Sequence, residues 1–314
     1  MKNQLKTNII DTLSYFDVFS YPLTLEQVEL FLHFQELDKK NLKSYLSKIP
    51  IIEKKYGYYF FSGREQVAVR RKMKETENER KLTIAKKYIS LLSNVPGVKM
   101  IGITGSLSMG NASENDDIDL FIITRKNTLW ITRFLVVCVT KCIGRRRSYG
   151  DKKVKDRLCL NMFLDERDLE FSEKSLYIAH EIVQMKVYYD EHRMFREFIE
   201  KNSWIQEFFP SIEVKRSNQK RKKRWFDFLF FSDRLVRFFN LFAFIFQYLY
   251  MSSKITREKV SLRKAFFHPN EYSGIILREY RKRSNDYQLM YENSNKLLHF
   301  EVKKGNVKPT KHYN

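Results

Sequence analysis

Cysteine is scarce in this sequence, with three residues among 314, and an odd number argues against a disulfide framework. Cys138 and Cys142 are one helical turn apart, but no second pair of cysteines or histidines nearby completes a zinc site. We therefore interpret them as buried thiols. The first residues lack the apolar core and small-residue cleavage site of a secretory signal. These absences predict a cytoplasmic protein.

The sequence has no internal repeat and no continuous apolar run of the about 20 residues that a transmembrane helix needs. Its most apolar stretch, 225–251, is rich in phenylalanine, but its longest uninterrupted apolar run is Leu241–Phe246. Asp, Arg, Asn and Gln residues interrupt the rest. The leading interpretation is a core helix. The alternative is a basic, aromatic helix that makes peripheral contact with a membrane surface.

Acidic residues are outnumbered, with 37 Asp and Glu against 58 Lys and Arg, which gives a formal charge of +21 and a pI of about 9.7. Such an excess favours polyanionic partners, namely nucleic acid, nucleotides or an anionic membrane surface. It does not choose among them, because a lysine-rich composition also arises in an AT-rich genome.

Two apolar, β-branched runs, 100–104 and 118–123, flank a polar turn and predict a strand, a turn with a short helix, and a second strand. Asp117 and Asp119 lie at the start of the second run. Because side chains alternate along a strand, both carboxylates point the same way. Mg²⁺ takes carboxylate oxygens and completes its shell with water and substrate phosphates. We therefore expect Asp117 and Asp119 to bind Mg²⁺ or Mn²⁺.

The turn between these runs contains Gly105 and Ser106. A glycine lets the backbone approach a phosphate closely. The serine adds a hydroxyl, and the backbone amides of the turn and of the following helix favour anions. Gly105 and Ser106 are therefore the predicted nucleotide-binding residues.

This arrangement resembles the DNA polymerase beta-like nucleotidyltransferase superfamily, whose signature is a Gly-Ser at the end of one strand and an Asp-x-Asp on the next. The resemblance covers residues 96–165. It implies a metal-dependent transfer of a nucleoside monophosphate from an NTP such as ATP to an acceptor on a protein, a small molecule or an RNA end. Asp117 and Asp119 would then hold the metal, and Gly105 and Ser106 would seat the β- and γ-phosphates.

Active members of that superfamily usually have a third carboxylate on a later strand. The corresponding strand here is Leu158–Leu164, whose central polar residue is Asn161. An amide cannot act as a base, so Asp151, Asp156 or Asp165 would have to substitute. The departure leaves an alternative function open: a catalytically degraded nucleotidyltransferase fold that binds nucleic acid through its basic surface or acts as a regulator.

The pattern of elements, together with the resemblance to the nucleotidyltransferase superfamily, predicts an α+β protein with four parts. A winged helix-like domain spans 1–63 and a linker helix 64–94. A small mixed-sheet, palm-like nucleotidyltransferase domain spans 95–190, and a C-terminal helical region spans 191–314.

In the first part, Thr24 is the predicted N-cap of a helix that continues through His33, with Gln27 at the capping-box position. A third helix is expected over 39–49, followed by a hairpin that turns near Gly57. The module could bind duplex DNA through this helix and wing. The expected recognition helix has lysines but no arginine to read guanine, so we favour a packing or dimerisation role.

A basic loop spans Arg145–Arg157. It could bind a triphosphate or a polyanionic acceptor, or it could be a solvated loop in a basic protein. Beyond it, apolar spacing predicts helical structure from Ser172 to near Pro210. His180 and Glu181 in this segment, and His268 further on, are interpreted as structural groups.

Overall fold

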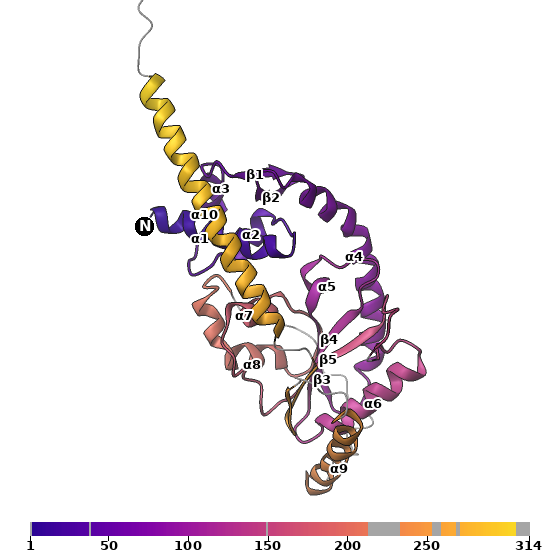
Figure 1. Ribbon diagram of the computed structural model, residues 1–314. Coiled ribbons are helices and arrows are strands. Elements are labelled where there is room, and N and C mark those ends of the chain that lie inside the picture. Colours follow the sequence, from indigo (N-terminus) through magenta and orange to yellow (C-terminus); the bar gives the residue numbers. More distant parts are fainter. Residues whose placement is uncertain are drawn as a thin grey trace, which may run out of the picture. The chain divides into compact units, whose positions relative to one another are not determined.

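The computed structural model describes residues 2–37, 39–148, 150–212, 233–252, 259–267 and 271–305 (Figure 1). The chain divides into two compact units. The first consists of residues 1–72, 206–212 and 275–314, and the second of residues 73–205 and 213–274.

The first unit begins with three helices and a hairpin. These are α1 (Lys2–Val18), α2 (Leu25–Leu30), α3 (Lys39–Leu46), β1 (Ile52–Lys55) and β2 (Tyr58–Phe61).

The capping box at the start of α2 is confirmed. The hydroxyl of Thr24 accepts from the backbone N–H of Gln27, and the Gln27 side chain accepts from the backbone N–H of Thr24. However, α2 ends at Leu30, before the predicted end at His33. His33 is fully buried, and its backbone N–H donates to the Thr12 hydroxyl at 3.1 Å instead of continuing the helix. A tertiary hydrogen bond therefore overrides the local helical pattern.

The hairpin turns as predicted. Lys55 pairs with Tyr58, which leaves a two-residue loop in which Tyr56 and Gly57 have φ angles of 52° and 83°. Two consecutive positive φ angles are typical of the turn whose twist matches the flanking strands. Within the same unit, Tyr287 of α10 (Glu271–Gly305) stacks on Phe61 with ring centroids 3.5 Å apart.

The second unit is built on a mixed six-stranded sheet in the order β6-β3-β4-β5-β8-β7. Its strands are β3 (Val98–Ile103), β4 (Ile118–Thr124), β5 (Leu158–Asp165), β6 (Lys186–Asp190), β7 (Lys259–Val260) and β8 (Lys264–Phe266). The pair β4 and β5 is parallel, whereas the other neighbours are antiparallel. The protein is therefore α+β with a mixed sheet, as predicted.

Two parts of this sheet lie where the sequence pattern indicated helix. The helical structure predicted from Ser172 to near Pro210 begins as α7 (Leu176–Gln184), but β6 interrupts it and pairs with β3. The expected C-terminal helical region contributes β7 and β8, of which β8 pairs with β5. These short segments gain their hydrogen bonds from strands distant in the sequence, so local periodicity did not indicate them.

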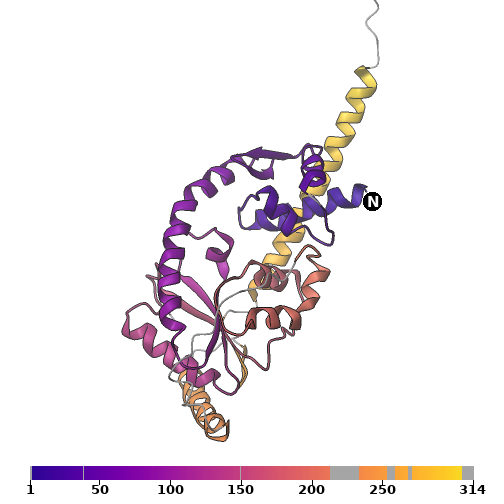
Figure 2. The ribbon, with the colours of Figure 1, turned by 180° about the vertical axis from the view of Figure 1, so that it is seen from behind.

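Helices cover both faces of the sheet (Figures 1 and 2). The predicted linker helix forms as α4 (Glu65–Leu92), and its part from Met73 onward shares a core with α6 (Leu129–Cys142) and the buried side chains of Ile118 and Leu120. On the opposite face, Phe121 contacts Phe198 of α8 (Met194–Lys201), with ring centroids 5.2 Å apart. Alternate residues of β4 thus face different layers, so its odd-numbered side chains lie on the α7–α8 side.

The two thiols of α6 differ from expectation. Cys138 is half-buried and Cys142 is exposed, and both are free. The core of this helix is instead formed by residues such as Trp130 and Val136.

A buried ionic network connects α4 to the segment just before β4. The Lys81 side chain is fully buried, and its ammonium donates to the carbonyls of Glu114 and Asp116 at 3.0 and 2.7 Å and to Asp156 at 2.8 Å. Arg80 donates two further hydrogen bonds to Asp156. Burial raises the pKa of Asp156, but the hydrogen bonds from Arg80 and Lys81 outweigh it and lower the pKa to about 2. The network fixes the backbone that delivers Asp117.

We expect Lys81→Met to reduce the free energy of unfolding by about 3 kcal/mol, because it removes one partner of a buried, hydrogen-bonded ion pair. Urea denaturation at pH 7 measures this. Lys155→Met, which removes an exposed partner of Glu114, should change stability by about 0.5 kcal/mol or less.

The ion pair between Lys81 and Asp156 also predicts that the free energy of unfolding depends on pH. Because the folded-state pKa of Asp156 is depressed, its stabilising contribution is present above about pH 4 and is lost as the pH falls toward 2. This account would be contradicted if Lys81→Met and Lys155→Met lost the same free energy of unfolding. It would also be contradicted if the pH midpoint of acid unfolding were the same in Lys81→Met as in the wild type.

Candidate functional site

The Gly-Ser turn follows β3 directly and lies against β4. The backbone N–H of Thr104 donates to the carbonyl of Asp119 at 3.1 Å, which joins the turn to the second strand. Gly105 then begins the short helix α5 (Gly105–Met109) with a φ angle of +66°. The local order is therefore strand, turn with a short helix, and strand, as the sequence predicted.

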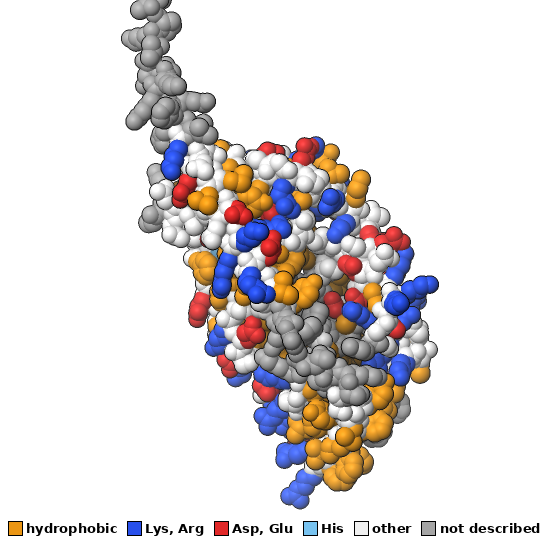
Figure 3. Space-filling view, viewed as in Figure 1, with side chains coloured by type: hydrophobic (Ala, Val, Ile, Leu, Met, Phe, Trp, Pro, Cys, Tyr) orange, Lys and Arg blue, Asp and Glu red, His pale blue; other side chains and the backbone are white. Residues whose placement is uncertain are grey.

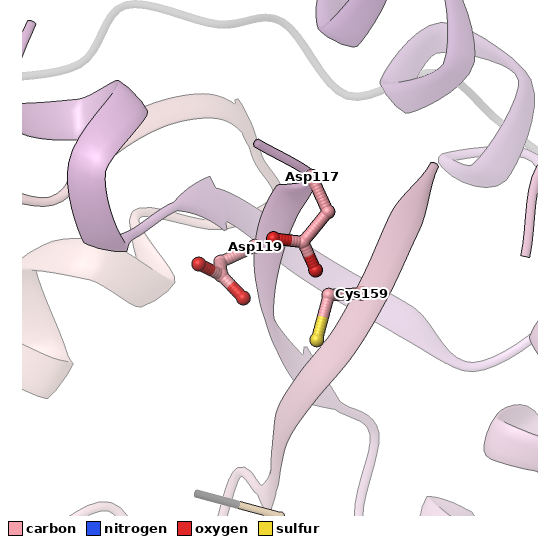
Figure 4. Close-up of side chains that lie close together, drawn as sticks. All are labelled: Asp117, Asp119 and Cys159. Atoms are coloured by element: carbon pink, nitrogen blue, oxygen red, sulfur yellow. The ribbon is translucent and has the colours of Figure 1, made fainter. Parts of the chain in front are cut away.

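Asp117, Asp119 and Cys159 converge beside this turn (Figure 4). Asp117 directly precedes β4, Asp119 lies within it, and Cys159 is the residue of β5 that pairs with Asp119. One potential ligand atom from each side chain lies within 4.8 Å of the other two. Two carboxylates and a thiol from neighbouring strands can thus reach one metal ion.

The carboxylate of Asp119 is poorly compensated by the protein itself. Its Oδ1 atom is buried and has no hydrogen-bond partner among the described residues. Burial raises the pKa of Asp119 above its usual range, and the negative charge of Asp117 raises it further, while the Cys159 thiol and the Arg147 guanidinium lower it. A buried, unpaired acceptor next to a like charge is the environment that a bound cation would relieve.

Gly105 makes room for this carboxylate. A Cβ atom at position 105 would lie 2.5 Å from Oδ2 of Asp119, well inside van der Waals contact, and the positive φ angle independently favours glycine. The sequence predicted close backbone approach to a phosphate at this glycine. The structure adds a second reason for a glycine here, which is the position of Asp119.

Ser106 lies at the predicted place, but its hydroxyl is engaged within the turn. It donates to Oδ2 of Asp116 at 3.1 Å, and the same oxygen accepts the backbone N–H of Ser113 at 2.8 Å. These bonds hold the connection between α5 and Asp117 in place. Phosphate binding by Ser106 remains a prediction.

Arg147 brings positive charge to the cluster. Its guanidinium forms an ion pair and hydrogen bond with Asp117 and lies 3.9 Å from the sulfur of Cys159. Arg147 belongs to the basic loop 145–157, for which phosphate binding and solvation were both considered. One arginine of this loop points into the cluster, while Arg157 pairs with Asp151.

Cys159, and not Asn161, occupies the position next to the aspartate pair. The pairing of β4 with β5 shifts register between Asp119 and Phe121, so that Asp119 pairs with Cys159 but Phe121 pairs with Met162. The extra residue on β5 is a β-bulge, and it follows the Asp119–Cys159 pair. The sequence pointed to Asn161 as the central polar residue of the strand, but that position does not indicate which residue pairs with Asp119. Asn161 is buried, and its carbonyl accepts from the backbone N–H of Phe267 at 3.0 Å.

The three aspartates considered in place of a third carboxylate ligand form ion pairs with other residues. Asp156 belongs to the network with Lys81, and Asp151 accepts from Arg157 and from the backbone N–H of Ser148. Asp165 is fully buried and is bound by Arg167.

The third carboxylate near the cluster comes from Glu181, which the sequence interpretation had set aside. Burial raises the pKa of Glu181 to about 7, and Asp119 adds to the rise, while a hydrogen bond from the backbone N–H of Gly105 lowers it. Glu181 is the single acidic residue of the otherwise apolar helix α7. That isolated charge on an apolar helix was the signal in the sequence, since such groups often lie at functional sites.

Glu181 also lines a pocket with an empty volume of about 960 Å³, open solvent at its mouth included. Thr104, Asn161 and Tyr177 contribute polar groups. Most of the remaining wall is apolar, from Phe121, Met162, Phe171, Ile182, Met185, Phe198 and Phe266. Burial and the charge of Glu181 raise the pKa of Tyr177, which keeps its hydroxyl protonated.

The two histidines considered with Glu181 are not part of this arrangement. His180 is fully buried, with Nδ1 lying 3.3 Å from the side-chain nitrogen of Gln184. His268 lies outside the described residues.

No family model matches the chain, and no curated protein matches it. Two solved structures do. A crystal structure of a toxin-antitoxin with AMP-PNP is 17% identical, with 38% of this chain and 89% of that chain covered and a TM-score of 0.25. A toxin-antitoxin MntA-HpeT mutant is 15% identical, with 38% and 88% covered and a TM-score of 0.24. Likeness at these scores carries no functional argument.

We expect Gly105→Ala to weaken Mn²⁺ binding by about 10- to 100-fold, the range seen when the positioning of a metal ligand is disturbed. The added methyl group would collide with the Asp119 carboxylate. Electron paramagnetic resonance of free Mn²⁺ measures the affinity.

Gly144→Ala is the matched control, since Gly144 has a φ angle of +65° but no atom within 4 Å of an added Cβ. It carries the same backbone strain without the collision. Unchanged Mn²⁺ affinity in Gly105→Ala, or equal losses in both variants, would refute the role assigned to Gly105.

Proposed function

We propose that this chain is a metal-dependent nucleotidyltransferase that moves a nucleoside monophosphate from an NTP to an acceptor. The observation that carries the proposal is the convergence of Asp117, Asp119 and Cys159 beside the glycine turn, with one Asp119 oxygen buried and unpartnered within the described chain. The α+β fold with a mixed sheet is compatible with it.

Asp117 and Asp119 would hold a divalent cation, with Cys159 as a third ligand. When bound, such a cation supplies positive charge that neutralises the triphosphate and the charge that develops on the leaving oxygen. The carboxylates fit the expected Mg²⁺ or Mn²⁺, whereas a thiol is a softer ligand than Mg²⁺ prefers. Assays with this protein therefore need Mg²⁺, Mn²⁺ and Zn²⁺ side by side.

Arg147 and the Gly105–Ser106 turn would bind the triphosphate. Arg147 pairs with Asp117 in the structure. If a cation neutralised Asp117, the guanidinium could turn to phosphate oxygens, which it can bind through two parallel hydrogen bonds.

Glu181 would receive the proton of the acceptor. In the transfer, an acceptor oxygen forms a bond to the α-phosphorus, the bond from that phosphorus to the bridging oxygen breaks, and pyrophosphate leaves. The proton of the acceptor hydroxyl passes to the Glu181 carboxylate. A carboxyl group with a pKa of about 7 suits a general base at neutral pH.

The pocket next to Glu181 would bind the acceptor. Its wall combines apolar and aromatic side chains with a few polar groups, which favours an acceptor with an apolar body and a hydroxyl. The identity of the acceptor is left to experiment.

Two observations favour a second candidate, a nucleotidyltransferase fold that binds nucleic acid or regulates without turnover. Arg147 occupies one aspartate, and a thiol replaces a third oxygen ligand. The charge of +21 supports a polyanionic partner. Such binding should weaken steeply with salt.

We expect wild-type protein to transfer label from an α-³²P-labelled NTP, ATP tested first, to itself or to a component of a cell extract. Asp119→Asn should lower the rate at least about 100-fold, because the site loses charge that binds the cation. Glu114→Gln is the control, since Glu114 is exposed and pairs with Lys155. No transfer with any of four NTPs and three metals, together with salt-sensitive DNA binding, would decide for the second candidate.

We expect Glu181→Gln to lower the rate by about 100-fold or more, as loss of a general base does. The wild-type rate should rise with pH and level off above about 7, because Glu181 must lose its proton to act as the base. With a cation bound, Asp119 would stay ionised, so we assign this limb of the profile to Glu181 and expect it to disappear in the variant. A pH–rate profile of both proteins tests this, and an unchanged limb in Glu181→Gln would exclude Glu181 as the base.

A further inference from the structure

Helix α9 (Asp233–Ser252) packs with its polar side inward. It lies against α6, and the residues it buries are Val236, Asn240, Gln247 and Met251. These four positions form one narrow stripe at helical spacing. A helix in the core of a soluble domain normally buries its apolar side and exposes its polar residues, so α9 is reversed.

Hydrogen bonds hold α9 in this orientation. The side-chain carbonyl of Asn240 accepts the backbone N–H of Trp130 at 2.8 Å, at the otherwise uncapped start of α6. The Gln247 amide donates to the Trp130 carbonyl at 2.7 Å and accepts from buried Arg133 at 2.6 Å. Because these groups would lose their partners if the helix rotated, the outward face is fixed.

The outward face is almost entirely apolar and aromatic, and we call it the aromatic face. Phe239, Phe242, Phe246 and Leu249 recur at spacings of three and four residues, with exposed fractions of 59%, 56%, 66% and 67%. Further exposed members are Leu235, Phe238, Leu241, Ile245, Tyr248 and Tyr250. Figure 3 shows these hydrophobic side chains gathered over the lower end of the view, where α9 lies. Contiguous exposed patches of this kind mark interaction surfaces.

The length and charges of α9 indicate the partner. Among the described helices α9 alone is long and apolar enough to cross a membrane. Its charged residues are confined to its first turns, at Asp233, Arg234 and Arg237. In the sequence it is preceded by 215–224, in which seven of ten residues are Lys or Arg. Aromatic side chains next to basic residues match the polar–apolar boundary of an anionic bilayer.

We propose that the aromatic face of α9 binds the surface of a membrane that contains anionic lipids. The helix lies in the plane of the interface, because one side of it is bonded to α6 through Asn240 and Gln247 and cannot face lipid. Phe242, Phe246 and Leu249 enter the boundary between headgroups and acyl chains, and Arg234 and Arg237 in the first turns of α9 contact lipid phosphates. This corrects the leading sequence interpretation of a core helix, as far as residues 233–251 are concerned; 225–232 lie outside the described residues.

Co-sedimentation of the full chain with vesicles tests the proposal. We expect binding to vesicles of phosphatidylcholine with phosphatidylserine, and much weaker binding to phosphatidylcholine alone. Phe242→Ser, Phe246→Ser and Leu249→Ser combined should lower the partition coefficient by at least about tenfold, since each removes apolar surface from the interface.

The control combines Met73→Ser, Leu262→Ser and Leu289→Ser, which remove equally exposed apolar side chains from other elements. It should bind vesicles as the wild type does, and both variants should melt like the wild type. Neither set of residues lines the candidate active site, so both should keep any nucleotidyltransferase activity.

Three results would overturn the proposal. The first is wild-type protein that stays in the supernatant with anionic vesicles. The second is a triple serine variant of α9 that binds as tightly as the wild type, which would leave the basic residues as the whole cause. The third is a wild-type dimer, measured by light scattering, that becomes a monomer in that variant without any vesicle binding, which would assign the aromatic face to a second copy of the chain.

Discussion

Like-charge repulsion between Asp117 and Asp119 is the constraint around which the candidate site is arranged. Asp117 directly precedes β4 and Asp119 lies two residues further on, so their carboxylates are close together, and that of Asp119 lies against Gly105. Bringing such charges together costs free energy unless a cation or a proton compensates. In this structure Arg147 compensates Asp117, and the raised pKa of Asp119 shows that its own compensation is incomplete. A further positive charge at this place would therefore lower the free energy of the two carboxylates.

The surrounding fold holds these charges in place. Lys81 bonds the backbone on the approach to Asp117, and the parallel pair of β4 with β5 brings Cys159 to Asp119. Helix α7 then covers the same side and adds Glu181 beside the Gly105 amide. Rigid strands and buried hydrogen bonds position these side chains accurately, and the basic loop adds Arg147, which pairs with Asp117.

The aromatic face of α9 and the candidate site are separate features of the second unit. At the site, two like charges are kept close together despite their repulsion, whereas in α9 apolar side chains are kept exposed to water. In both places, buried polar contacts fix side chains in an orientation that costs free energy. A membrane-bound nucleotidyltransferase would meet acceptors that concentrate at a bilayer, which connects the two proposals without either depending on the other.

Local pattern in the sequence determined much of this protein. The strand, Gly-Ser turn and Asp117–Asp119 strand, the capping box of α2 and the hairpin at Gly57 follow from alternation, turn chemistry and capping, which act over a few residues. Only the tertiary structure decided the rest. The pairing of β4 with β5 placed Cys159 beside Asp119, strand pairing made β6 from a predicted helical segment, and packing brought Glu181 to the site. These outcomes depend on contacts between segments far apart in the chain, whose free energy no short stretch of sequence carries.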